Sequence, residues 1–337
     1  MIPSERLDQA DARIAPHIVR TPLTHDAARN LYVKWENRQK TGSFKARGAL
    51  NKVLSLSADQ LARGIVTASA GNHGQGAALA GQLTGARVVC FVSEGAVPVK
   101  VDAIRALGAE IVTVAGGYPE AEAAARKFAE ENRQTWISPY NDEQVIAGQG
   151  TIGLELIASP LFSGEGTEAS SATILVPVSG GGLIAGIGLA LARLSPRPRL
   201  VGVQPETAPF MHGLFYRGSQ AGIPDLPSLA DGLTGAVEAD SITIPLARKL
   251  VDEIVLVSEE EIARAAAFAF YEYGEVVEPS GAVAIAAALR TVERNDVLLG
   301  RDSGGRHPVQ VAIVSGGNVQ PEVHAGIAAG YAREAQG

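Results

Sequence analysis

Lys45 stands where the sequence could place a reactive amine. Ser43 is a residue type that often caps a helix, and the apolar residues after it, at helical spacing, predict that a helix begins here. Lys45 then lies in the first turn, at the positive end of the helix dipole. That position disfavours its ammonium form and favours the neutral amine that attacks an aldehyde. From this residue alone, a solvated lysine on a helix surface is the alternative.

Three glycine-bearing turns each follow a predicted strand, at the end where open α/β sheets bind ligands. In the first, 69–73, the backbone N–H groups with Ser69 and Asn72 could hold an anion such as a substrate carboxylate, or form only a capped tight turn. In the second, 178–183, three successive glycines would let the backbone close around a phosphate. The third, 315–318, is by itself typical of a plain turn before a helix.

The second turn also imitates a dinucleotide-binding fingerprint. Its glycines are Gly180, Gly182 and Gly186, and an acidic residue, Glu206, ends the next predicted strand. The spacing Gly-x-Gly-x-x-x-Gly is one residue longer than the usual form, and this interpretation leaves the lysine and the first turn unexplained. An NAD-dependent dehydrogenase is therefore kept only as an alternative of a different class.

Strands and helices alternate along the chain, which predicts an α/β fold with two open, mainly parallel sheets and helices on both faces. The expected strands are 31–36, 65–69, 88–92, 111–114, 135–138, 172–178, 200–203, 254–257 and 309–314. We expect a large cofactor-binding domain from residues 1–55 and 142–337, and a small mobile substrate-binding domain from residues 64–141. Residues 159–171 are expected to form a surface loop. Residues 218–245, rich in Gly, Pro and Asp, should cross the surface or roof a site.

The composition is that of a globular enzyme, since 46% of the 337 residues are hydrophobic and 19% are charged. A net charge of −7 argues against nucleic-acid binding, because no basic face is left to neutralise phosphates. No apolar run could span a membrane and the N-terminus lacks a signal pattern, so we expect a cytoplasmic protein without membrane contact. The single cysteine, Cys90, should be a small buried hydrophobe, and the six histidines show no zinc pattern.

Taken together, the motifs resemble the pyridoxal-phosphate enzymes of the tryptophan-synthase-β type, or fold type II. The most similar group is that of the threonine/serine dehydratases and serine racemases. The motifs are Gly-Ser-Phe-Lys at 42–45, Ser-Ala-Gly-Asn-His at 69–73, Ser-Gly-Gly-Gly-Leu at 179–183 and Ser-Gly-Gly-Asn at 315–318, with further similarity at 145–151 and 277–282. The resemblance implies a tryptophan-synthase-β-like fold with the cofactor between the two domains.

The resemblance also implies a role for each motif. Lys45 would bind pyridoxal 5'-phosphate covalently and act as the catalytic residue. The other residues implied to bind the cofactor are Phe44 beside the ring, Asn72 on the ring hydroxyl, Gly180, Gly181, Gly182 and Leu183 on the phosphate, and Ser315 facing the pyridine nitrogen. The substrate would be bound by the first turn, Ser69, Ala70, Gly71, Asn72 and His73.

The implied chemistry fits these residue types. An uncharged hydroxyl at Ser315 makes the ring a moderate electron sink, which elimination tolerates. Removal of the α-proton by Lys45 and departure of a β-hydroxyl would give a 2-oxo acid and ammonia. The sequence thus predicts a threonine/serine ammonia-lyase, or dehydratase. The alternatives are a serine racemase, another lyase of β-hydroxy amino acids, and a relative that binds the cofactor without turnover; the preferred amino acid stays open.

The chain departs from its relatives at several positions. In serine racemases a serine that donates a proton aligns with Ala70, so we expect little racemisation. Metal-dependent members have carboxylates where Gln204 and Phe210 align, so no metal site is expected, although Glu206 could supply one oxygen. The chain ends soon after Ser315, so no regulatory domain is expected. We expect a small-molecule amino-acid substrate and a homodimer as the assembly.

Overall fold

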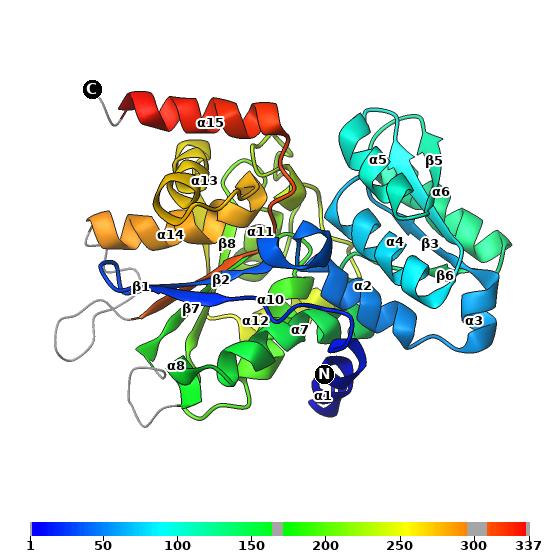
Figure 1. Cartoon of the computed structure of the whole chain (residues 1–337), viewed down its shortest axis with the longest axis horizontal. Coiled ribbons are helices and arrows are strands. Elements are labelled where there is room, and N and C mark those ends of the chain that lie inside the picture. Colours follow the sequence, from blue (N-terminus) through cyan, green and yellow to red (C-terminus); the bar gives the residue numbers. More distant parts are fainter. Residues whose placement is uncertain (1, 164–170, 295–308, 335–337) are drawn as a thin grey trace.

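The structure is a computed structural model that describes residues 2–163, 171–294 and 309–334. Its strands form two sheets, one of six strands and one of four, which lie in two lobes side by side (Figure 1). The predicted α/β fold with two mainly parallel sheets is confirmed. The domain boundaries given above remain a prediction.

The larger sheet has the order β1-β2-β10-β7-β8-β9, and within the described strands only β1 and β2 pair antiparallel. The strands are β1 (Leu23–Asp26), β2 (Leu31–Trp35), β7 (Thr173–Pro177), β8 (Arg199–Pro205), β9 (Glu253–Val257) and β10 (Gln310–Val314). The inner strands β7 and β10 are buried at every position, as expected of parallel strands covered on both faces. β1 was not predicted, because none of its four residues is fully buried and it lacks an apolar alternation.

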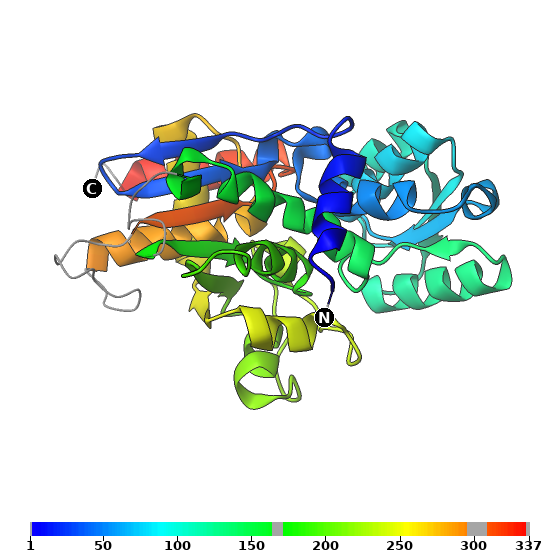
Figure 2. The same ribbon diagram turned by 90° about the horizontal axis from the view of Figure 1, so that it is seen from below.

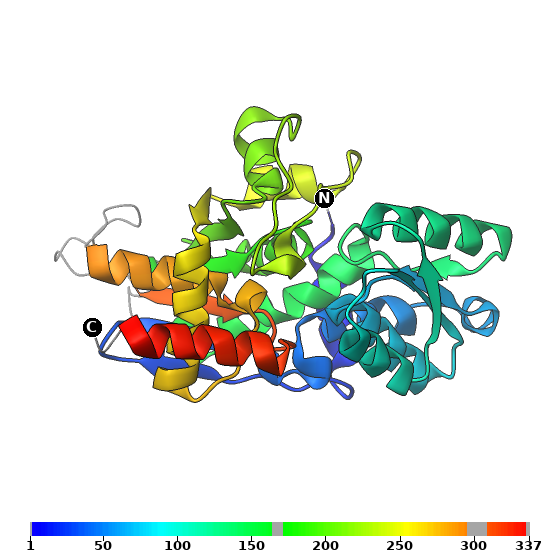
Figure 3. The same cartoon turned by 90° about the horizontal axis from the view of Figure 1, so that it is seen from above.

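Helices cover both faces of this sheet. One face packs against α13 (Glu259–Tyr273) and α14 (Pro279–Arg294), and the other against α7 (Glu143–Ile157), α10 (Gly182–Leu191), α11 (Phe210–Arg217) and α12 (Thr243–Leu250). Figure 3 shows α15 (Pro321–Glu334), in red, on the outer side of α13. The short helix α8 (Pro160–Ser163) lies in the segment predicted as a loop; residues 164–170 of that segment lie outside the described residues.

The smaller sheet is parallel, with the order β5-β4-β3-β6. Its strands are β3 (Ile65–Ala68), β4 (Val88–Ser93), β5 (Glu110–Val114) and β6 (Thr135–Trp136). Helices α4 (Asn72–Thr84) and α5 (Pro98–Ala106) pack on one face and α6 (Tyr118–Glu131) on the other, while α3 (Ala58–Arg63) precedes the sheet. Cys90 on β4 is a buried free thiol, as predicted.

Helix α2 (Lys45–Leu54) lies between the two lobes and packs closely on both sides. A Cβ at Gly48 would lie 2.8 Å from the Val145 carbonyl oxygen on α7, and one at Gly148 of α7 would lie 2.6 Å from the Arg47 carbonyl oxygen. Only glycine therefore fits at the crossing of α2 with α7. The N-terminal helix α1 (Glu5–Ile14), in dark blue, also lies at the junction of the lobes (Figure 2).

A buried ionic network joins α2 to the larger sheet. Arg47 donates from Nε and Nη2 to the two carboxylate oxygens of Glu36, at 2.7 and 2.8 Å. Its Nη1 donates to Glu155 on α7 at 2.6 Å, and Glu155 also pairs with Lys34 on β2. All four side chains are at most 6% exposed, so the network holds two cations and two anions away from water.

Part of the segment 218–245 contacts the smaller lobe. Its 3-10 helix Asp231–Leu233 places a carboxylate 2.8 Å from Lys100 on α5, and Glu238 lies 2.9 Å from Arg126 on α6. Both ion pairs join residues of the larger lobe to helices of the smaller one. Among the described helices, none is long and apolar enough to cross a membrane.

Candidate active site

Lys45 is the first residue of α2, so its predicted place in the first helical turn is confirmed. The prediction that Ser43 caps this helix is wrong, since the N-cap residue is Phe44 and no side chain caps it. Ser43 instead has an extended backbone, with φ −160° and ψ 159°, and forms an antiparallel bridge with Gly316. The strand-like pairing takes the place of a cap.

The Lys45 side chain is buried and weakly basic. Its Nζ donates to the Pro139 carbonyl oxygen at 2.9 Å and lies 5.1 Å from the centroid of the Phe44 ring. Burial lowers the pKa of Lys45 to about 8, and the nearby Glu278 carboxylate opposes that shift. A substantial share of the amine is therefore neutral near pH 8, and burial is the main cause of the shift.

The third turn runs beside the residues that precede Lys45. Phe44 N donates to the Ser315 carbonyl oxygen at 3.0 Å, and Gly317 N donates to the Gly42 carbonyl oxygen at 2.9 Å. Ser315 itself is buried at the end of β10. The turn that alone resembled a plain turn before a helix thus forms one wall beside the lysine.

The first turn begins α4 and approaches the same place. Gly71 N donates to Ser69 Oγ at 3.1 Å, which closes the turn. Asn72 donates from Nδ2 to Glu278 Oε1 at 2.7 Å, so it contacts the other lobe. A Cβ built on Gly71 meets nothing within 4 Å and therefore points into open space, and Ala70 is partly buried against the small-lobe core.

His73 is buried beneath this turn. Its Nε2 lies 3.1 Å from the Ile137 carbonyl oxygen, which can only accept, so Nε2 carries the hydrogen. Burial, together with the charge of Lys45, lowers the pKa of His73 to about 3. The imidazole is therefore neutral at physiological pH and is a poor proton donor. Its expected role in substrate binding remains a prediction.

The second turn leads into α10. Gly181 has φ +84°, a backbone conformation that side-chain-bearing residues rarely adopt, and serves as the N-cap without a side-chain cap. A Cβ on Gly180 would lie 2.4 Å from the Tyr140 ring, and Thr243 Oγ1 donates to the Gly180 carbonyl oxygen at 2.6 Å. Gly182 and Leu183 are the first residues of α10. Neighbouring protein atoms therefore leave little room for a side chain at these glycines. Their lack of a side chain would also leave the helix N-terminus open to an anion.

The lysine and the second turn meet the same short segment. Pro139 accepts the hydrogen bond from Lys45, and the next residue, Tyr140, packs against Gly180. Among the described residues, Thr41 Oγ1 and Ser43 Oγ are buried without a hydrogen-bond partner, which a polar ligand would relieve. A partly neutral amine, an uncapped helix N-terminus and these hydroxyls fit a phosphorylated aldehyde.

Sequence reasoning missed several residues that hold this arrangement. Glu278 lies within the quoted motif 277–282 but was given no role, and Asn318 was quoted only as the end of the third turn. Tyr140 and Thr243 carry no motif at all, and no sequence signal would have found their contacts with Gly180. These contacts depend on how the chain folds back from distant positions.

The residues aligned with metal ligands, and a glycine of the dinucleotide-like fingerprint, have other partners in the structure. Gln204 Oε1 accepts from His212 N at 3.0 Å, and Phe210 packs in the apolar core. In the ranges that the structure describes, no group of three or more His, Cys, Asp or Glu side chains is placed to hold a metal ion. Gly186 is explained by helix packing, since a Cβ there would lie 2.4 Å from the Ile146 carbonyl oxygen on α7.

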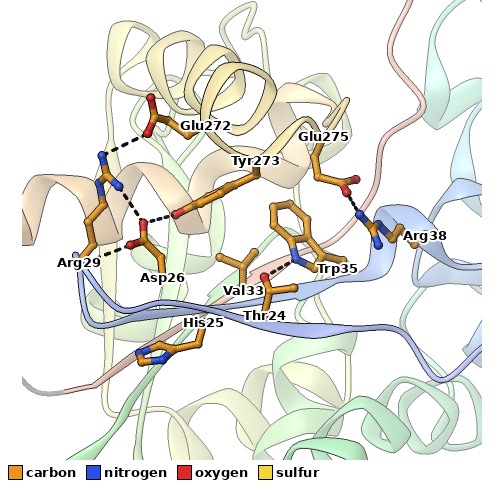
Figure 4. A pocket seen from close by; sticks show the side chains of 10 residues that line it. All are labelled: Thr24, His25, Asp26, Arg29, Val33, Trp35, Arg38, Glu272, Tyr273 and Glu275. Carbon is orange, nitrogen blue, oxygen red and sulfur yellow. Dashed lines mark hydrogen bonds and ion pairs between the residues drawn. The ribbon is translucent and has the colours of Figure 1, made fainter.

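A cavity of about 430 Å³ lies elsewhere, between β1, β2 and the C-terminal end of α13 (Figure 4). Its charged groups are paired with one another: Arg29 contacts Asp26 and Glu272, and Arg38 pairs with Glu275. None of the residues of the four motifs lines it. The residues that line it are Thr24, His25, Asp26, Arg29, Val33, Trp35, Arg38, Glu272, Tyr273 and Glu275.

Comparisons with known proteins show which family the chain matches and which enzymes it is similar to. Residues 14–300 match the family described as "Pyridoxal-phosphate dependent enzyme". The chain is 40% identical over 326 residues to an L-threonine ammonia-lyase of Geobacter sulfurreducens, which covers 95% of this chain and 76% of that protein. It superposes on a serine racemase of maize with a TM-score of 0.84 at 31% identity, covering 99% and 98% of the two chains. With threonine deaminase isoform 2 of Solanum lycopersicum the TM-score is 0.83 at 31% identity, covering 96% and 93%.

Proposed function

The chain belongs to the pyridoxal-phosphate-dependent enzymes, and from that premise we propose that it is an L-threonine/L-serine ammonia-lyase. It would convert a β-hydroxy amino acid into a 2-oxo acid and ammonia. The observation that carries this proposal is the buried amine of Lys45, whose pKa is lowered to about 8 where the motif-bearing segments meet. The 40% identity to an L-threonine ammonia-lyase supports the choice of reaction.

The cofactor is pyridoxal 5'-phosphate. When bound, it supplies an electron sink that weakens the α C–H bond of the amino acid. We propose that Lys45 binds it covalently, that Phe44 lies beside its ring and that Asn72 meets its ring oxygen. We assign the phosphate to the residues at the N-terminus of α10, and the pyridine nitrogen to Ser315. The phosphate residues are Gly180, Gly181, Gly182 and Leu183.

The side chains of the protein have separate tasks in this proposal. The Lys45 amine takes the α-proton, and its lowered pKa leaves it partly neutral at working pH. The turn 69–73 holds the substrate carboxylate through its backbone N–H groups, with the open space above Gly71 as the place for the substrate. Approach of this turn to the larger lobe excludes water.

A panel of β-hydroxy amino acids tests the reaction. We expect 2-oxo acid and ammonia to be released from L-threonine or L-serine without added nicotinamide cofactor. An enzyme that is inactive on the whole panel while retaining the cofactor would point to a non-catalytic family member. Activity that depends on added NAD would support the dehydrogenase instead.

Racemisation is the second candidate activity, and the similarity to a serine racemase favours testing it. Proton delivery on the face opposite Lys45 needs a donor, which the methyl group of Ala70 is not, and His73 is neutral with its N–H directed at a carbonyl. We therefore expect Ala70→Ser to raise the ratio of racemisation to elimination by about tenfold or more. Chiral analysis of residual serine measures both rates. Rapid D-serine formation by the unmodified protein would contradict the assignment.

Gly181→Asp should weaken retention of the cofactor, because a carboxylate at the N-terminus of α10 repels the phosphate. Gly181→Ala is the matched control, since it introduces the same Cβ, the same contact with Met211 and the same strain at φ +84° without the charge. We expect cofactor occupancy after dialysis to fall at least about tenfold more for the aspartate variant than for the alanine variant. Equal occupancy in the two folded variants would count against the phosphate site.

Three further assignments stay proposals. These are the division into a large domain (1–55 and 142–337) and a small mobile domain (64–141), a homodimeric assembly, and a cytoplasmic location. Serine as a substrate beside threonine belongs with them. Sedimentation of the purified protein at several concentrations tests the dimer directly.

A further inference from the structure

We propose that Asn318 and Glu278 are positioning residues that fix the orientation of the Asn72 carboxamide. In that orientation Asn72 offers an N–H, and not its carbonyl oxygen, to the ring oxygen of the bound cofactor. The inference rests on the proposed function, because it takes Asn72 as the residue that meets this oxygen. The sequence motifs contain both positioning residues and give neither a role.

The direction of the hydrogen bonds follows from a backbone carbonyl. Asn318 Nδ2 lies 2.7 Å from the Thr41 carbonyl oxygen, which can only accept, so the atom of Asn318 at this place must be the nitrogen. The same nitrogen lies 2.7 Å from the Asn72 carboxamide and donates its second hydrogen there. The Asn72 atom that faces Asn318 is therefore an acceptor, Oδ1.

Glu278 fixes the other end of the same carboxamide. Asn72 Nδ2 donates to Glu278 Oε1 at 2.7 Å, and a carboxyl oxygen accepts this bond in either protonation state. Both ends of the Asn72 carboxamide are thus held, and one N–H on Nδ2 remains for a ligand. An ionised ring oxygen can only accept, so this remaining N–H is the group that would stabilise it.

The hydrogen bonds also cross between the lobes. Asn72 begins α4 in the smaller lobe, whereas Thr41, Asn318 and Glu278 belong to the larger one. Glu278 is buried, and burial raises its pKa to about 7. The charged groups that interact electrostatically with its carboxyl group include Lys45, Lys100 and Asp231. Because a change of charge at Glu278 would itself alter the spectrum, the first test uses the uncharged Asn318.

The absorption spectrum of the bound cofactor tests the proposal, since it reports whether the ring oxygen is ionised or protonated. We expect Asn318→Ala to lower the ratio of ionised to protonated ring oxygen by about tenfold, the size of one charge-assisted hydrogen bond. Spectra are normalised to the cofactor released on denaturation. Asn132→Ala, an exposed asparagine at the end of α6, is the matched control and should leave the ratio unchanged.

A double-mutant cycle shows whether Asn318 acts through Asn72. Asn72→Ala alone should lower the same ratio, and Asn318→Ala should add nothing in that background. An effect of Asn318→Ala that persists without Asn72, or no effect in a fully loaded variant, would overturn the inference. No effect of Asn72→Ala would instead remove Asn72 from the ring oxygen, a failure of the site assignment in the proposed function.

Glu278 gives a second comparison that holds charge constant. Glu278→Gln and Glu278→Met both remove the carboxylate, but only the glutamine keeps an acceptor for Asn72 Nδ2. We expect the methionine variant to show a ratio about threefold lower than the glutamine variant. Equal ratios in the two loaded proteins would contradict a role for Glu278 in holding Asn72. If Asn318→Ala does not fold, this comparison still tests whether the orientation of Asn72 depends on its hydrogen-bond partners.

Discussion

Replacing Lys45 by alanine should lower kcat for release of the 2-oxo acid by at least about a thousandfold, because the variant loses both the covalent attachment and the group that moves the α-proton. We expect the unmodified protein to be yellow from its bound cofactor and the purified variant to lose this colour. Borohydride treatment followed by peptide mapping of the unmodified protein should place the reduced cofactor on Lys45. Steady-state assays of both proteins measure the loss of turnover.

Lys40→Ala is the control for this variant. Lys40 is exposed five residues before Lys45, so its replacement should leave turnover and label unchanged. Reduced cofactor found on any lysine other than Lys45, or substantial turnover by the folded Lys45→Ala protein, would contradict the site.

Arg47→Met should lower the free energy of unfolding by about 3–5 kcal/mol, because it leaves buried carboxylates without their partner. Arg47 is fully buried and donates to Glu36 and Glu155; without it, Lys34 is the one cation left in the network for two anions. Urea unfolding of the cofactor-free protein measures the difference. Loss of the network should also displace α2, so the cofactor occupancy of the variant should fall.

The double variant Arg47→Met/Glu36→Met separates an unpaired charge from lost packing. It removes a cation and an anion together and should recover part of the stability, since apolar replacements of similar volume often match buried ion pairs. If the double variant is instead less stable than the single one by a further comparable amount, unpaired charge is not the cause.

Local patterns were enough to predict the fold and the position of Lys45 at the start of a helix. The alternation of apolar strands and helices predicted two parallel sheets, and a lysine at the start of a helix predicted the amine. Ser43 was misjudged because a capping residue type says nothing of a distant partner, and its backbone pairs with Gly316. For the same reason, the contact of Asn72 with Glu278 and the contact of Tyr140 with Gly180 could not be predicted.

The buried ionic network is the feature that the sequence was least able to predict. Glu36 and Arg47 are of residue types that usually lie at the surface, yet both side chains are fully buried. Their charges are compensated because four side chains from β2, α2, α7 and the 3-10 helix Glu36–Arg38 meet at hydrogen-bonding distance. No property of any one segment indicates that meeting.

The pairing of the residues before Lys45 with the turn after β10 also determines when, during synthesis, this part of the site can form. Thr41 and Asn318 are 277 residues apart in the chain, and β2 pairs with β10 along its whole length. During synthesis the lysine leaves the ribosome long before the wall beside it is made. A nascent chain that stops before β10 would therefore expose the unpaired edge of β2, so we expect stable cofactor binding only after β10 has been made.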